Sequence, residues 1–117
     1  MRNFRTYHVW THGIDLVSMV YQVTQLIPGN ETHSLVRQMQ RAAVSVPSNF
    51  AEGCGRDGEK DFKRFVEIAL GSSYELETQM IIANNLYGIE VNPLYKATFD
   101  LLSKVQAELN ALRNKLK

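Results

Sequence analysis

The stretch from Arg41 to Arg56 holds the residues whose types and spacing best fit ligand binding. On a helix its polar side chains share one strip, because residues three and four positions apart are neighbours. The strip consists of Arg37, Arg41, Ser45, Ser48 or Asn49, Glu52 and Arg56. The planar guanidinium of an arginine in such a strip suits a phosphate or a carboxylate. The alternative is a solvated helix face or a structural network, in which Glu52 pairs with Arg56. The same spacing along the chain lets Ser45 pair with Asn49.

A second group of basic residues follows directly. It contains Arg56, Lys60, Lys63 and Arg64, and the last three share one helix face with Glu67. Acidic residues intervene, and Glu59 has the spacing of a surface ion pair with Lys63, so an ordinary solvated face is the alternative interpretation. In a ring of several copies, however, this group predicts a repeated band of positive charge suited to nucleic-acid phosphates.

The carboxylates further along predict a structural role. Glu75 and Glu77 point about 200° apart on a helix, so they do not converge as a paired acid–base site. One of them is placed to receive an arginine from the preceding helical segment. The small residues Gly71, Ser72 and Ser73 are expected to permit close approach of two helices.

The sequence contains no pattern suited to a metal site or a catalytic nucleophile. His8 and His12 lie one helical turn apart, but no carboxylate has the matching spacing, and His33 stands alone. Cys54 lacks a local partner histidine, and neither phosphate-binding glycine motif is present. We therefore expect no enzymatic activity, no cofactor and no metal.

The remaining pattern predicts an all-α protein. Turn and cap signals at Pro28-Gly29-Asn30, Gly53-Cys54-Gly55, Gly88 and Asn92-Pro93 divide the chain into segments near 7–27, 31–54, 57–88 and 92–116. Gly55 is expected to take a left-handed cap conformation, and Asp57 to cap the third helix. Apolar residues recur at three- and four-residue steps in each segment. Short connections then favour an antiparallel up-down-up-down four-helix bundle.

Two features exceed what a single bundle needs. Pro47 interrupts the second apolar pattern, and predicts either a kink or the start of a new turn there. The first segment carries two adjacent apolar stripes, one from Trp10 to Thr24 and one from Val9 to Ile27. Ile81, Ile82, Leu94 and Leu101 also lie off the main stripes of their segments. Spare apolar stripes favour self-association.

Composition bounds these hypotheses. With 117 residues the chain has room for one domain, residues 1–117, and 44% hydrophobic with 21% charged residues is typical of a folded protein. The net charge of +1 predicts no strong global attraction to nucleic acid. No apolar run reaches the length of a membrane helix, and the first residues do not resemble a secretory signal. We expect a cytoplasmic protein that does not bind membranes.

The chain resembles the proteins encoded in 23S rRNA intervening sequences, which form four-helix bundles. Two long motifs carry the resemblance, Arg41–Gly53 and Ala69–Thr78, in the order typical of that family. Phe4, Trp10, Pro28, Gly55-Arg56, Phe62, Phe65, Leu109, Leu112 and Leu116 extend it over nearly the whole chain. Phe50 stands where the family usually has isoleucine, and Thr11-His12-Gly13 replaces a more basic stretch.

The resemblance implies an antiparallel bundle that assembles as a ring, typically a homopentamer. It also implies kinship with the accessory variability protein of diversity-generating retroelements, which binds nucleic acid and a reverse transcriptase. Arg41, Asn49, Glu52, Gly53 and Arg56 match the family signature.

Two functional hypotheses follow. The first is a non-enzymatic oligomeric bundle that binds RNA or DNA, with or without a protein partner. Its candidate residues are Arg37, Arg41, Asn49, Glu52, Arg56, Lys60, Lys63 and Arg64. The second is a protein-interaction scaffold without nucleic-acid affinity, which the nearly neutral charge favours. A nuclease is disfavoured because no base, nucleophile and orienting group can be assembled.

Overall fold

The computed structural model describes residues 2–31 and 34–117, and all regular structure within these ranges is helical. The prediction of an all-α fold with four helices is confirmed. They are α1 (His8–Thr24), α2 (Leu35–Cys54), α3 (Glu59–Tyr87) and α4 (Pro93–Lys115). Each is shorter than its predicted segment because the flanking residues form caps and the short 3-10 turns η1 (Phe4–Thr6), η2 (Gly29–Glu31) and η3 (Ile89–Val91). Residues 32 and 33 of the second predicted segment lie outside the described residues.

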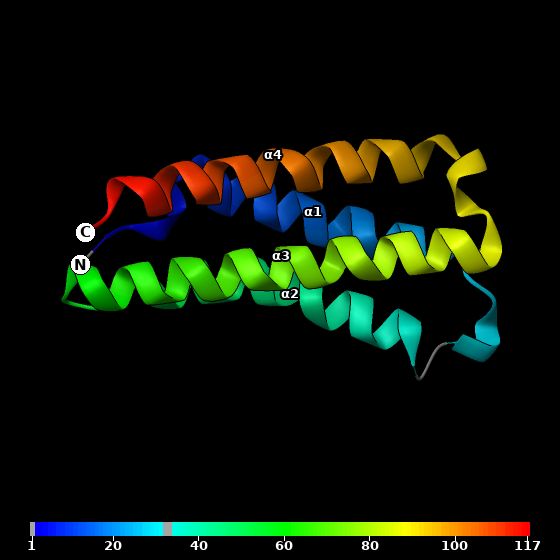
Figure 1. Ribbon diagram of the computed structural model, residues 1–117, viewed down its shortest axis with the longest axis horizontal. Coiled ribbons are helices and arrows are strands. Elements are labelled where there is room, and N and C mark those ends of the chain that lie inside the picture. Colours follow the sequence, from blue (N-terminus) through cyan, green and yellow to red (C-terminus); the bar gives the residue numbers. More distant parts are fainter. Residues whose placement is uncertain (1, 32–33) are drawn as a thin grey trace.

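The four helices lie side by side along the long axis of a molecule measuring 44 × 24 × 20 Å (Figure 1). Both chain ends lie at the end of the molecule where α2 passes into α3, and η3 joins α3 to α4 at the other end. The core between the helices draws on all four, through fully buried side chains such as Leu16, Met39, Leu76 and Leu102. Within the described residues, no helix has the length and hydrophobicity of a membrane span.

The helix ends confirm some cap predictions and correct others. Asn92 caps α4, because its Oδ1 accepts the N–H of Leu94 at 2.9 Å and Pro93 occupies the first helical position. Gly55 ends α2 with φ −82°, so the predicted left-handed cap is wrong there; Gly88 adopts that conformation, with φ 62°. The predicted cap at Asp57 is also wrong, since Gly58 precedes α3 without a side-chain cap.

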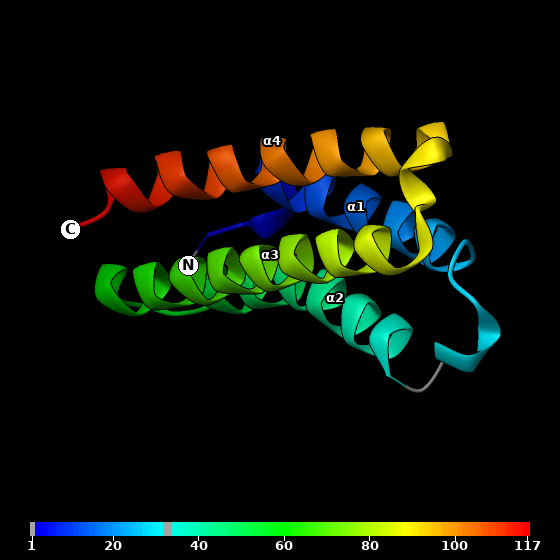
Figure 2. The ribbon, with the colours of Figure 1, turned by 45° about the vertical axis from the view of Figure 1, so that its right-hand side comes forward.

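Helix α2 continues through Pro47 without interruption, which excludes the predicted alternative of a new turn at this residue. Pro47 lacks the N–H that would otherwise bind the carbonyl of Ala43. Its ring is buried against α1 at Gly13, where an added Cβ would lie 3.2 Å from the Pro47 Cβ. Figures 1 and 2 show the N-terminal turns of α2, drawn in cyan, diverging from α3. A proline is the usual reason for a bend within a helix.

Helix α2 approaches α3 closely at Gly53. A Cβ on this residue would lie 2.6 Å from the Cβ of Phe65 and 3.3 Å from the ring of Phe62. No such requirement exists at Gly71, where an added Cβ would meet no atom within 4 Å. Gly53 therefore permits close packing of the two helices, and the expectation for Gly71 is wrong. Ser72, from the same predicted group, does meet α2, with its hydroxyl 2.8 Å from that of Ser45.

We predict that Gly53→Ala destabilises the fold and that Gly71→Ala stabilises it. The new methyl of Gly53→Ala meets the Phe65 Cβ, and such overpacking costs about 1–3 kcal/mol. Gly71 lies within α3 in open space, so alanine gains about 0.5–1 kcal/mol through helix propensity. Urea denaturation of both variants measures the two shifts. Stabilisation by Gly53→Ala would contradict the close packing of α2 on α3.

Candidate nucleic-acid interface

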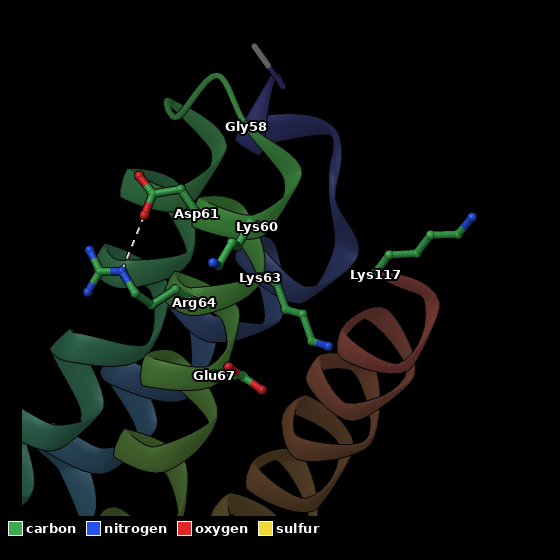
Figure 3. A pocket seen from close by; sticks show the side chains of 7 residues that line it. All are labelled: Gly58, Lys60, Asp61, Lys63, Arg64, Glu67 and Lys117. Carbon is green, nitrogen blue, oxygen red and sulfur yellow. Dashed lines mark hydrogen bonds and ion pairs between the residues drawn. The ribbon is translucent and has the colours of Figure 1, made fainter.

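Three of the predicted basic residues meet at the start of α3. Lys60, Lys63 and Arg64 line an open depression of about 600 Å³, to which Lys117 contributes from the end of the chain. Figure 3 shows the Lys60 and Lys63 side chains entering this region from α3, with Glu67 below them and Lys117 beyond the end of α4. The sequence did not single out Lys117, because its position beside α3 depends on how α4 packs.

The basic side chains of this depression differ in whether an acidic side chain pairs with them. Within the described part of the chain, Lys60 and Lys63 form no ion pair, so the predicted pair of Glu59 with Lys63 is absent. The Arg64 Nε lies 3.2 Å from the Asp61 Oδ1, a contact drawn in Figure 3. Lys60 and Lys63, and likewise Lys117, thus offer ammonium groups without an ion pair in the described ranges to an incoming anion.

Arg56 sits beside this depression but is already engaged. Its guanidinium lies 3.0 Å from the Glu52 carboxylate, as the spacing predicted, and 3.9 Å from that of Asp61. It also lies 4.8 Å from the ring centre of Phe65, which Arg64 approaches to 4.6 Å. Cation–aromatic contacts of this kind position a guanidinium without removing its charge.

The segment before α1 adds further positive charge to the same end of the molecule. The backbone N–H of Arg2 donates to the Cys54 carbonyl at 3.0 Å, and its guanidinium lies 4.0 Å from the ring centre of Phe62. Arg5 lies 4.4 Å from the ring centre of Phe4, which itself packs edge-on against Trp10. These contacts attach two arginines to the end where α2 passes into α3.

The fold therefore concentrates positive charge at one end of the molecule, although positive and negative side chains nearly cancel in the net charge. Segments 2–7, 52–67 and 113–117 form this end of the molecule (Figure 1) and contain nine Lys and Arg against five Asp and Glu. The other segments contain four Lys and Arg against seven Asp and Glu. We call the first set the basic end. The net charge of +1 thus conceals an excess of +4 at one end.

Arg37 and Arg41 lie away from the basic end, on the N-terminal half of α2. Arg41 lines a separate depression of about 380 Å³ between α2 and α3, together with Glu75 and Gln79. The distance between the groups divides the predicted binding strip into two parts. Arg37 is exposed and outside this depression.

The middle of the predicted strip is structural. Asn49 Nδ2 donates to the carbonyl and the hydroxyl of Ser45, at 2.9 and 2.8 Å, which confirms the predicted pairing. The Ser45 hydroxyl also lies 2.8 Å from that of Ser72 and links α2 to α3. Asn49 is therefore occupied within the fold. Glu77 accepts from the Nε2 of Gln106 at 2.9 Å rather than from an arginine of α2.

Within the described residues, the histidines form no three-ligand metal group and Cys54 is a buried thiol. His12 Nδ1 lies 2.9 Å from the Glu108 Oε1, a pair between α1 and α4 that local spacing had not indicated. His8 stacks on His12, but no group of three potential ligands surrounds a metal position in the described ranges, and His33 lies outside them. Burial raises the pKa of the Cys54 thiol to about 11, and the charge of Arg2 opposes this only in part. A thiol with that pKa is protonated at neutral pH and is a poor nucleophile.

Among the described residues, one buried side-chain polar atom has no hydrogen-bond partner. The Oε1 of Gln79 makes no hydrogen bond within the described residues, although its side chain is 7% exposed. We predict that Gln79→Met, which keeps the length of the side chain, stabilises the protein by about 1 kcal/mol, because an unsatisfied buried polar group costs about 1–3 kcal/mol. Thermal and urea denaturation measure the change. Destabilisation would show that the amide already has a partner in the folded protein.

Comparison with known families agrees with the resemblance seen in the sequence. The family model described as 23S rRNA-intervening sequence protein matches residues 5–111. No curated protein gives a significant match. The matched region includes α1, α2, α3 and most of α4, and it contains all the predicted basic residues. Four basic residues of the basic end lie outside it, namely Arg2, Arg113, Lys115 and Lys117. The chain belongs to the 23S rRNA-intervening sequence protein family.

Proposed function

We propose that this protein is a non-enzymatic, self-associating bundle that binds the phosphates of RNA or DNA through its basic end. The observation that carries the proposal is the charge separation, with nine basic and five acidic residues in the segments of that end. Lysines bind phosphates as point charges, and their unpaired ammonium groups release condensed counterions from a nucleic acid. Lys60 and Lys63, which make no ion pair in the described ranges, are the central residues.

The proposal assigns different roles to the predicted residues. Arg64 and Arg56 add positive charge next to the lysines, held in place by Asp61 and the Phe65 ring. Glu52 positions Arg56 rather than contacting the ligand. Binding is electrostatic and involves no reaction of the ligand. Among the described residues no group of three potential ligands could hold a metal, and the Cys54 thiol is protonated at neutral pH.

The nearly neutral total charge favours the other hypothesis, a scaffold for proteins without nucleic-acid affinity. The decisive difference between the two is salt dependence. Phosphate binding weakens steeply as salt rises, whereas docking of apolar surfaces does not.

We predict that a Lys60→Gln, Lys63→Gln double variant binds nucleic acid more weakly and with a shallower salt dependence. Loss of two phosphate contacts lowers the slope of log K against log salt by about 1.4 for single strands and about 1.8 for duplexes. Fluorescence anisotropy with structured RNA, single-stranded RNA and duplex DNA measures both quantities.

The control is a Lys96→Gln, Lys104→Gln double variant, which removes the same formal charge from exposed positions on α4 outside the basic end. Lys96 pairs with Asp100 at 2.9 Å, so the Lys104→Gln single variant is measured beside it as the unpaired case. Equal losses in the two double variants would assign binding to overall charge. No binding of the wild-type protein at low salt would favour the scaffold.

Self-association is supported by the outward stripe of α1. The Val9–Ile27 stripe enters the core, whereas Ile14 and Tyr21 of the other stripe remain 42% and 44% exposed. Ile14 also lines an apolar groove of about 430 Å³ between α1 and α2, with Phe4, Trp10, Val17, Ser18, Val44, Pro47, Ser48 and Ala51. We propose that the four helices alternate in direction as an antiparallel up-down-up-down bundle, in which α1 and α2 are neighbours on either side of this groove. We propose that copies contact one another here and form a ring, with five subunits as in the family's typical assembly.

We predict that Ile14→Asp, Val44→Asp dissociates the assembly, because burying two carboxylates in an apolar contact is strongly unfavourable. Sedimentation velocity measures the mass. Val91→Asp is the control, since Val91 lies in η3, far along the chain from this groove, and is 88% exposed. A monomeric wild-type protein, or an unchanged mass in the double variant, would contradict this interface.

A further inference from the structure

We infer that the depression between α2 and α3 holds a guanine base of a single strand whose phosphates lie on the basic end. This inference rests on the proposed nucleic-acid binding and adds base selectivity to it. The residues that carry it are Arg41, Glu75 and Gln79, which line one depression of about 380 Å³.

The charged groups of this depression are opposite in sign but do not satisfy each other. Arg41 and Glu75 are both exposed, and neither forms an ion pair within the described ranges. A donor and an acceptor that line one depression without pairing suit a ligand carrying acceptors on one edge and donors on another. The small side chains of Ala42 and Ser45 line the same space.

Guanine has that distribution. Its O6 and N7 accept two hydrogen bonds from one arginine, the pairing that proteins use most often to recognise this base. Its N1–H and N2 amino group donate in parallel, and a carboxylate accepts two such bonds. Adenine offers no pair of parallel donors to a carboxylate. Bases of single strands expose these edges, whereas a duplex hides the Watson–Crick edge.

The unpartnered amide gives the second, independent indication of a ligand. Gln79 lines the depression and is only 7% exposed. Its side-chain carbonyl oxygen has no hydrogen-bond donor in the described part of the chain. Such atoms are rare in native proteins and call for an explanation. The oxygen has less than 1 Å² of accessible surface, so the Gln79 side chain must rotate toward the depression before a ligand can reach it. The guanine amino group has a second hydrogen that the carboxylate does not use, and it would satisfy this oxygen after that rotation.

The depression is within reach of a strand bound at the basic end. Arg64 and Glu75 are eleven positions apart in α3, which places them on the same helix face about 16 Å apart along the axis. That distance corresponds to about five nucleotides at the 3.4 Å spacing of stacked bases. Between them, Gly71 offers no side chain to obstruct the path, and an added Cβ there would meet no atom within 4 Å.

The test uses uridine-rich single-stranded RNA of about 12 nucleotides with one central guanosine, adenosine or inosine. Inosine lacks the N2 amino group. We expect guanosine to bind about ten-fold more tightly than adenosine, as one bidentate base contact predicts, and inosine to lose part of this preference. Glu75→Gln and Arg41→Gln each bring the guanosine-to-adenosine ratio close to one.

The ratio is the readout because Glu75→Gln also removes a negative charge and raises affinity for every strand. Arg37→Gln, one turn from Arg41 and outside the depression, is the control and keeps the ratio. Salt-sensitive binding without any preference for guanosine would overturn this inference and leave the proposed function intact. Absence of salt-sensitive binding to every strand would overturn both.

Discussion

Helix α2 touches each of its neighbours at a glycine, and these two contacts orient the rest of the molecule. Gly13 of α1 leaves room for the Pro47 ring, and Gly53 leaves room for Phe65 and Phe62 of α3. The contact at Gly53 brings the end of α2 against the start of α3 and so places Arg56 beside Arg64. At its other end α2 diverges from α3 (Figure 2). Arg41 and Glu75 line an open depression between the two helices. One helix thus determines the positions of both candidate binding regions.

The distribution of charge has more functional meaning than its sum. A chain with a net charge of +1 has little attraction to nucleic acid as a whole, but the basic end carries an excess of +4 among its side chains. Attraction over about 10 Å, the screening length at moderate salt, depends on the local excess. Self-association would repeat this excess around an assembly. The proposed interface lies on α1 and α2, and most of its residues are not part of the basic end. The two surfaces meet at Phe4, which lines the apolar groove and is next to Arg5 of the basic end.

The sequence predicted the helices well because their apolar spacing and the Asn92-Pro93 start are local signals. It also predicted the local pairs of Glu52 with Arg56 and of Asn49 with Ser45. Contacts between distant segments could not be inferred in this way. The approach of Lys117 to α3, the pair of His12 with Glu108, and the burial of Gln79 depend on how the helices pack. The predicted polar strip treated residues on one helix face as one site. Its members lie far apart along α2, and the structural role of Asn49 in the middle divides them.

The proposed function depends most directly on which surface of the protein a nucleic acid contacts. Lysine acetylation footprinting, read by mass spectrometry with and without bound single-stranded RNA, reports this for each lysine separately. We expect RNA to protect Lys60 and Lys63 strongly, to protect Lys117 as well, and to leave Lys96 and Lys104 unchanged. Uniform protection of all these lysines, or protection of Lys96 and Lys104 alone, would contradict a binding surface at the basic end.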